Sequence, residues 1–247
     1  MIVAAALPDI PEVRAGDDLG ALLVAAAGRL SDGDVLVVAH KVVSKAEGRT
    51  VRLADVQPGE RALQLAAEHG KDARVVEVIL GESSAIVRSR PGVLICRTQH
   101  GFVCANAGVD ASNAGAGGEL VLLPSDPDAS ARALRSRLRV LTGVAPGIVI
   151  TDSFGRAWRV GQCDVAIGIA GIAPADDWRG RPDGAGRPLE ATVIAVADEA
   201  AAAADLTRGK DTREPAVLVR GLERHVTAGD GPGAAALVRA RAEDLFL

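Results

Sequence analysis

Three short polar stretches of the chain carry side chains that could do chemistry. The first, residues 40–45, reads His-Lys-Val-Val-Ser-Lys and follows the apolar run at residues 35–38. Lysines at the end of a strand can contact the oxygens of a polyphosphate as compact cations. A solvated turn is the alternative, because the sequence has neither a Gly-x4-Gly-Lys-Ser/Thr phosphate loop nor a Gly-x-Gly-x-x-Gly motif after a strand. This stretch alone therefore leaves phosphate binding and a surface turn both open.

The other two stretches offer oxygen atoms that could bind a metal ion. Residues 106–113 read Asn-Ala-Gly-Val-Asp-Ala-Ser-Asn, and residues 151–153 read Thr-Asp-Ser after the apolar run at 147–150. Mg²⁺ prefers oxygen ligands, and ligands of open α/β sheets bind outside the carboxyl ends of strands. An Asx-rich turn and a helix cap are the alternative interpretations. Two carboxylate segments and one basic segment make metal-assisted phosphoryl transfer a hypothesis.

The hydrophobic pattern predicts the elements that must position these stretches. Helices are expected at residues 19–27, with Asp17 or Asp18 as the cap, and at 61–68, 131–141, 189–206 and 233–245. Strands are expected at residues 35–38, 74–80, 147–150, 164–169 and 216–219. Four arginines of the third helix are expected on its solvent side: Arg132, Arg135, Arg137 and Arg139. The pattern indicates a mixed α and β fold and does not fix the strand order.

Composition excludes several classes of function. The net charge of −4 argues against nucleic-acid binding, which needs a basic face. The three cysteines lack C-x-x-C spacing, and the N-terminal residues form neither a signal peptide nor a membrane span. With three Phe, two Trp and no Tyr among 247 residues, the core is expected to consist of Val, Leu, Ile and Ala. We therefore expect a cytoplasmic protein that has no membrane or nucleic-acid partner.

The polar stretches belong to a series of motifs that occur in a fixed order. They are residues 7–10, 32–35 leading into 43–49, 106–113, 151–156, 165–171, 177–180, and 197–199 leading to 209–210. The series resembles the coenzyme F-420-0:L-glutamate ligases, also called F-420 gamma-glutamyl ligases, over residues 7 to about 222. Each motif alone is weak evidence for the family, and the resemblance is specific because all the motifs occur in the same order.

The resemblance implies a single ligase domain over residues 1–247, with an α+β, mixed-sheet fold and intertwined subdomains in a homodimer. Residues 240–247 resemble a linker to a flavin-binding domain that is absent from this chain. The implied activity is the GTP-dependent addition of L-glutamate to the deazaflavin F-420-0 in coenzyme F-420 biosynthesis. A gamma-glutamyl amide bond forms through an acyl phosphate, GDP and phosphate are released, and Mg²⁺ or Mn²⁺ is required. A related amide ligase for another carboxylate cofactor and a non-catalytic nucleotide-binding subunit are the alternatives.

The resemblance also implies roles for individual residues. Asp110, Asp152 and Lys45 would be catalytic, with Asp110 and Asp152 ligating one cation and Ser153 a second. The nucleotide would contact Leu7, Pro8, Asp9, Ile10, His40, Lys41, Lys45, Asn113, Arg208, Gly209, Lys210 and Asp211. Lys210 stands where archaeal-type members have a carboxylate ligand of the second cation. The partners would be small molecules: the deazaflavin precursor, L-glutamate and GTP.

Overall fold

A mixed five-stranded sheet forms the centre of the molecule in the computed structural model, which describes residues 1–111, 118–209 and 211–244. The strand order is β1 (Val3–Ala6), β12 (Ala216–Arg220), β2 (Val35–Ala39), β8 (Gly147–Arg156) and β9 (Arg159–Ala170). Only β2 and β8 pair in parallel, whereas the other neighbours pair antiparallel. The predicted α+β class with a mixed sheet is therefore confirmed.

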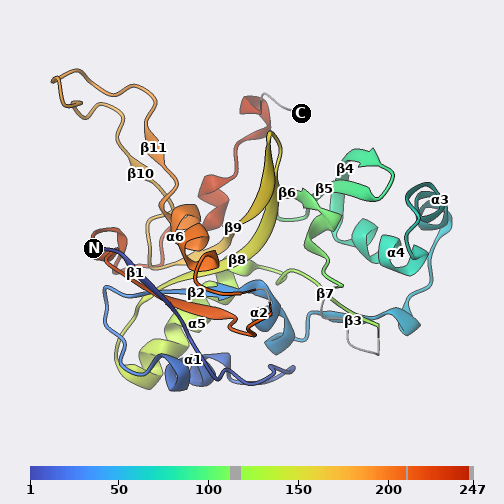
Figure 1. The fold of residues 1–247 in the computed structure, drawn as a ribbon, viewed down its shortest axis with the longest axis horizontal. Coiled ribbons are helices and arrows are strands. Elements are labelled where there is room, and N and C mark those ends of the chain that lie inside the picture. The colour runs from blue at the N-terminus through green and yellow to red at the C-terminus, as the bar shows by residue number, and fades with distance from the viewer. Residues whose placement is uncertain (112–117, 210, 245–247) are drawn as a thin grey trace.

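Helices cover both faces of this sheet (Figure 1). On one face, α1 (Leu19–Ala27) and α5 (Pro127–Thr142) pack with Leu36 and Val38 of β2. On the other face, α6 (Val196–Asp205) packs with Val35 and Val37. Because β2 is buried on both faces, its sequence is a continuous apolar run rather than an alternating one. The predicted strand at 35–38 and the predicted helices at 19–27 and 131–141 are confirmed.

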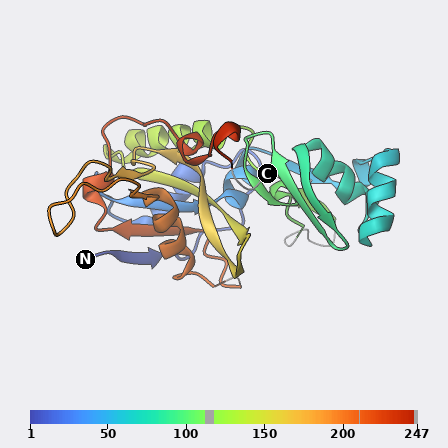
Figure 2. The ribbon, with the colours of Figure 1, turned by 90° about the horizontal axis from the view of Figure 1, so that it is seen from above.

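Most of the described residues between β2 and α5 form a second, smaller lobe with its own core beside the sheet (Figure 2). It begins after α2 (His40–Ala46) and holds α3 (Glu60–His69), α4 (Ala73–Gly81), β4 (Ser83–Arg90), β5 (Val93–Thr98) and β6 (Val103–Ala105). The pair β3 (Thr50–Arg52) and β7 (Glu119–Val121) joins this lobe to the sheet. Leu65, Ile79 and Leu94 are fully buried in it. The helix predicted at 61–68 is confirmed as part of α3.

The strand predicted at residues 74–80 is wrong, because these residues form α4. Asp72 caps this helix by accepting a hydrogen bond from the backbone of Arg74. Val76 and Ile79, three positions apart, face the core together, as residues on one side of a helix do. The β-branched run suggested a strand, but burial of this one face overrides that weak local preference.

Two predicted helices differ from the observed structure. Of residues 189–206, only Val196–Asp205 are helical, and Val193–Ile194 form β11, which pairs with β10 (Asp176–Asp177) at the base of a projecting arm. Residues 233–244 form two 3₁₀ turns, Ala234–Leu237 and Arg241–Glu243, instead of a helix. At the first turn, the Asp128 carboxylate accepts a hydrogen bond from the backbone of Ala234 and so fixes this segment against α5.

Arg135 is buried, whereas Arg137 and Arg139 of α5 are exposed and Arg132 is half-buried. Its guanidinium donates to the backbone oxygens of Ala145, Pro146, Thr227 and Ala228 and pairs with Asp230 at 2.8 Å. It lies against Gly171, whose φ is +71° and where a Cβ would clash with the guanidinium. A buried charge is tolerated when all its donors have partners, which explains this exception to the helix pattern.

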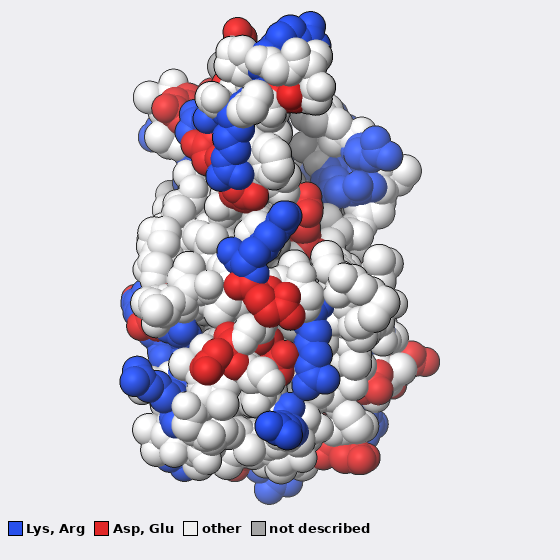
Figure 3. All heavy atoms as spheres, turned by 90° about the vertical axis from the view of Figure 1, so that its left-hand side faces the viewer, with Lys and Arg blue, Asp and Glu red and all other residues white. Residues whose placement is uncertain are grey.

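Charges of both signs are interspersed on the face of the described chain seen in Figure 3. On the arm, for example, Arg179 pairs with Asp177 at 2.6 Å, and Arg181 pairs with Asp176 at 3.1 Å. Within residues 1–111, 118–209 and 211–244, no helix is both long and apolar enough to cross a membrane.

Candidate active site

The described parts of the predicted site segments meet at one edge of the central sheet. Strands β1, β2 and β8 point in the same direction, because β12 lies antiparallel between β1 and β2 while β2 is parallel to β8. Residues 7–10, 40–45 and 151–153 therefore leave or extend the strands on the same side. The chain before β12 arrives there too, where Pro215 accepts a hydrogen bond from Ala39. This is the edge at which open α/β sheets bind their ligands.

Backbone strain occurs in three of the segments predicted to form the site or to border the nucleotide. Among the described residues, four that are not glycine have positive φ: Asp9 (58°), Asn106 (52°), Ala107 (53°) and Arg213 (58°). They lie in the segments 7–10, 106–110 and 208–214. Such conformations cost of order 1–3 kcal/mol each and cluster at ligand sites. Their positions therefore support the selection of these segments independently of side-chain type.

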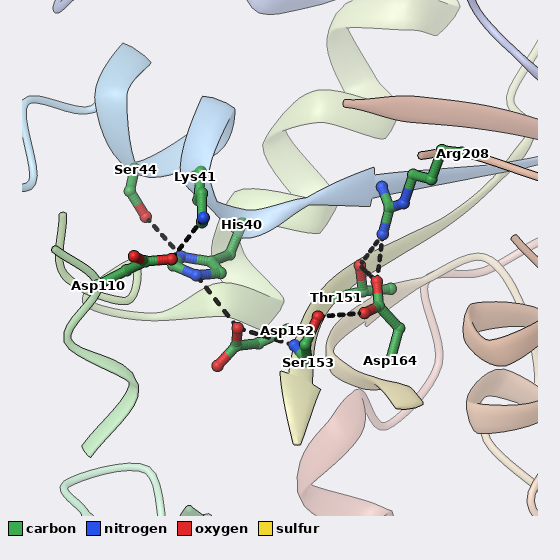
Figure 4. Close-up of polar contacts among 9 residues, drawn as sticks. All are labelled: His40, Lys41, Ser44, Asp110, Thr151, Asp152, Ser153, Asp164 and Arg208. Carbon is green, nitrogen blue, oxygen red and sulfur yellow. Dashed lines mark hydrogen bonds and ion pairs between the residues drawn. The ribbon is translucent and has the colours of Figure 1, made fainter. Parts of the chain in front are cut away.

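His40 and Asp152 form the first pair of facing side chains (Figure 4). His40 is the first residue of α2 and is almost completely buried, and its Nδ1 lies 3.4 Å from Ser44 Oγ. Its Nε2 lies 3.4 Å from Asp152 Oδ1 without forming a hydrogen bond to any described residue. Residues 40–45 thus form a helical turn with a buried inner side rather than a solvated turn.

Lys41 and Asp110 form the second pair. Lys41 Nζ lies 2.5 Å from Asp110 Oδ2, and both side chains are partly exposed. Asp110 is held in place by two backbone hydrogen bonds to Val121 at the end of β7. The ion pair joins the sheet edge to the smaller lobe and offsets the charge of a carboxylate that could otherwise bind a cation.

Replacing Lys41 with methionine is expected to tighten Mn²⁺ binding about two- to fivefold in the absence of nucleotide. The reason is that Lys41 competes with a cation for Asp110, and a partly exposed ion pair is worth about 0.5–1 kcal/mol. Calorimetric titration with Mn²⁺ measures the change, with Lys71→Met in the smaller lobe as the control. Weaker Mn²⁺ binding by Lys41→Met would contradict this competition.

A buried carboxylate, Asp164 of β9, organises the residues next to Asp152. It accepts hydrogen bonds from Thr151 Oγ1 at 2.8 Å and from Ser153 Oγ at 2.6 Å. The Arg208 guanidinium also donates to Asp164 and lies 3.1 Å from Thr151 Oγ1. Since a carboxylate only accepts, the Ser153 hydroxyl must donate its hydrogen to Asp164. Any further partner of the Ser153 oxygen must then be a donor or a cation.

The available atoms fit a hard cation better than a soft one. Asp110 and Asp152 offer carboxylate oxygens, and the buried Asn106 Oδ1 has no hydrogen-bond partner among the described residues. No group of three or more His, Cys, Asp or Glu side chains suited to a metal occurs in the described part of the chain. Mg²⁺ is typically held by one or two carboxylates, water and substrate phosphates rather than by a complete protein cage. The site therefore fits Mg²⁺ or Mn²⁺ carried with a nucleotide.

The other predicted nucleotide contacts that the structure describes lie around this edge. Leu7 is buried and donates its N–H to Ala216, whereas Pro8 and Asp9 are exposed and Ile10 is half-buried. Lys45 Nζ lies 2.5 Å from the exposed carboxylate of Glu12, just after that segment. Gly209 and Asp211 are exposed, whereas the Arg208 side chain is turned inward to Asp164. Asn113 and Lys210 lie outside the described residues.

Asp164 is the site residue that sequence reasoning missed. Its signal was present as a lone carboxylate at the start of the apolar run 165–170. Charged residues are almost never fully buried unless they are paired. The strand was recognised, but its first residue was not recognised as a partner of Thr151, Ser153 and Arg208.

Comparison with known proteins gives a consistent result along almost the whole chain. A model of the F420-0:Gamma-glutamyl ligase family matches residues 9–221. The coenzyme F420:L-glutamate ligase of Methanopyrus kandleri is 48% identical over 237 residues, which cover 95% of this chain and 93% of that protein. The proteins of the same name from Methanothermobacter thermautotrophicus and Methanocaldococcus jannaschii are 44% and 39% identical, over 96% of this chain and 95% and 94% of their own lengths.

The mixed sheet, the carboxylates and cations at its edge, and these matches define an enzyme of the ligase class. The chain belongs to the F420-0:Gamma-glutamyl ligase family. The family resemblance predicted from the ordered motifs is thereby confirmed.

Proposed function

We propose that this chain is a GTP-dependent ligase that joins L-glutamate to F-420-0 by a gamma-glutamyl amide bond and releases GDP and phosphate. The observation that carries the proposal is the convergence of Asp110, Asp152 and the α2 lysines at one sheet edge, in a chain whose relatives are named coenzyme F420:L-glutamate ligases. Carboxylates and lysines in this arrangement suit phosphoryl transfer, in which catalysis is mainly positioning and charge stabilisation. The reaction would take place in the cytoplasm.

The proposed roles follow from the chemistry of each side chain. Asp110 and Asp152 would hold Mg²⁺ or Mn²⁺, with Ser153 as a ligand of a second cation. The bound metal would withdraw charge from the phosphate oxygens during transfer of the terminal phosphate. Lys41 and Lys45 would contact the nucleotide as cations, and segments 7–10 and 208–211 would border it. The acceptor carboxylate, activated as an acyl phosphate, would then be attacked by the glutamate amine.

The decisive experiment measures phosphate release from GTP with each substrate omitted in turn. The proposal expects release only when L-glutamate and the deazaflavin are both present, with the glutamylated product seen by mass spectrometry. Turnover with a different carboxylate acceptor in place of the deazaflavin would indicate a related amide ligase. Binding of GTP without turnover for any acceptor would indicate a nucleotide-binding subunit. Either outcome would overturn the proposal.

Replacing Lys45 with alanine is expected to raise the KM for GTP by roughly 10- to 150-fold and to lower the rate. A charge-assisted hydrogen bond to phosphate is worth about 1.5–3 kcal/mol, which corresponds to this range. Steady-state kinetics with GTP as the varied substrate provides the measurement. Glu12→Gln is the matched control, because it breaks the same ion pair and leaves the lysine in place. Unchanged GTP kinetics in Lys45→Ala would show that the lysine serves only the surface pair.

A homodimer is also part of the proposal. Strand β1 is an edge of the central sheet, and Ile2 and Val3 at this edge are exposed. Apolar edge strands are prone to pair with another chain, which supports an assembly of two copies. Light scattering at micromolar concentration should give twice the mass of the chain, and a monomer there would refute this part of the proposal.

A further inference from the structure

A pocket of about 280 Å³ lies beside the candidate site, at the edge of the sheet formed by β9. One wall comes from the hairpin β8–β9 and another from the residues just before and in β6. The third wall is the C-terminal segment around Leu237 and Val238, which runs next to the hairpin (Figure 1). Asp198 of α6 completes the lining, so the pocket is built from four parts of the chain that are distant in sequence.

The pocket gathers a large share of the few aromatic side chains. The whole sequence has three Phe, two Trp and no Tyr, and the buried core is aliphatic. Nevertheless Phe102 and Phe154 both line this pocket and meet edge to face, with their ring centroids 6.3 Å apart. The ring of His100 stacks on Phe102 at 5.8 Å. Both phenylalanines are only half-buried, so their rings are placed at a surface that a flat ligand could cover.

Charge in the pocket is balanced between cations and carboxyl groups. Arg97 and Arg239 contribute two cations, and Asp198 and Asp244 contribute two carboxyl groups. Arg97 lies 3.9 Å from Asp244, and Asp198 accepts a hydrogen bond from the backbone of Ala166. Because no sign of charge prevails, affinity here must come mainly from apolar and aromatic contact, as in most small-molecule sites.

The pocket adjoins Asp152 through two strands. Asp152 and Phe154 are two positions apart in β8, so their side chains share one face at a spacing of roughly 7 Å. From the other side, β6 places Cys104 within electrostatic reach of Asp152: burial raises the pKa of the Cys104 thiol to about 12, and the Asp152 charge adds to the shift. Val103, the neighbour of Cys104, lines the pocket. A ligand that contacts the Phe154 ring can therefore place a neighbouring group close to the Asp152 carboxylate.

We propose that this pocket binds the fused-ring part of the acceptor substrate, a flat heteroaromatic system such as a deazaflavin, and directs the acceptor carboxylate toward Asp152. This inference rests on the proposed function, since it assigns a place to the acceptor of that reaction. The rings of Phe102 and Phe154 would contact the acceptor ring, while GTP and the cation would occupy the opposite side of Asp152, toward α2.

The test compares two pocket variants with a matched control. Phe154→Leu and Phe102→Leu are each expected to weaken deazaflavin binding about threefold to tenfold, because an aromatic contact is lost while most apolar area remains. Binding is followed by the change in deazaflavin fluorescence on titration with the full chain, without GTP or metal. Trp158→Leu, an exposed aromatic of the same hairpin outside the pocket, is the control and should bind normally.

Steady-state kinetics shows whether the two phenylalanines bind the acceptor or only stabilise the fold. In steady-state assays the same variants should raise the KM for deazaflavin and leave the KM for GTP and the Mn²⁺ affinity unchanged. Val103→Trp adds bulk at an exposed position of the wall, so it tests the pocket without emptying the core, and it should block ring binding. Normal deazaflavin binding in Phe154→Leu and Val103→Trp would overturn the inference, as would failure of the unmodified protein to bind deazaflavin. Ring binding with the expected variant effects but without turnover would support the pocket and refute only the proposed function.

Discussion

Replacing Asp152 with asparagine is expected to abolish turnover and to weaken cation binding by about tenfold or more, and Asp110→Asn is expected to do the same. Mutating a residue that only hydrogen-bonds to a metal ligand typically lowers metal affinity or activity about 10- to 100-fold. Removing the charge of a ligand itself should therefore lower them at least as much. Neither change should unfold the protein, because both side chains are partly exposed and asparagine keeps their shape.

The measurement is calorimetric titration of Mn²⁺ with GDP present, together with turnover at limiting Mg²⁺ or Mn²⁺. Asp177→Asn is a matched control. Asp177 lies in β10 on the arm, and its carboxylate pairs with Arg179 rather than with any residue of the candidate site. That ion pair lowers the pKa of Asp177 to about 2, so the control also removes a fully charged aspartate. Normal turnover of Asp110→Asn or Asp152→Asn at limiting metal would rule out the corresponding residue as a ligand.

Asp164→Asn is expected to lower the free energy of unfolding by about 3–5 kcal/mol, which is the typical cost of removing one partner of a buried ion pair. The Arg208 guanidinium would remain buried without its anion, and one amide oxygen cannot accept from Thr151, Ser153 and Arg208 together. Since whole domains are stable by only about 5–15 kcal/mol, this single change should be visible as a large shift in denaturant midpoint.

The same variant should also raise the metal concentration needed for activity, because the Ser153 hydroxyl loses the acceptor that orients it. Asp128→Asn is the control: its Oδ1 accepts backbone hydrogen bonds from Ile169 and Ala234, and asparagine retains that oxygen. A much smaller loss of stability is expected there. An unfolding free energy for Asp164→Asn equal to that of the unmodified protein would show that Asp164 does not hold these groups together.

The spacing of apolar residues predicts those helices and strands whose buried positions follow a regular period or form a continuous run. The helix at 131–141 and the strand at 35–38 have unambiguous apolar periodicity, and both were correct. The segment at 74–80 was not, since four of its seven residues, Val75, Val76, Val78 and Ile79, are β-branched and only the packing of Val76 and Ile79 selects a helix. Arg135 shows the same limit, because its acceptors come from segments about 10 and 93 residues away.

The candidate site was predictable in part for a different reason. Residues 40–45 and 151–153 were recognisable because polar side chains directly follow or extend apolar runs at the sheet edge. The contacts between these segments were not predictable, because Asp164 reaches Ser153 through strand pairing and Arg208 through a loop. Motif order indicated the family, whereas the partner of each charged group required the three-dimensional arrangement.

Strand β8 makes the protein unusually sensitive to changes in chain length at one place. Thr151 and Ser153 face the Asp164 network, whereas Asp152 and Phe154 face His40 and the aromatic pocket. Side chains alternate between the two faces, so deleting or inserting one residue directly before Thr151 would exchange all four positions at once. The tip of the hairpin, residues 155–161, is exposed and could absorb such a change without moving any of them. Insertions and deletions should therefore be tolerated at residues 155–161 and should abolish activity when they fall directly before Thr151.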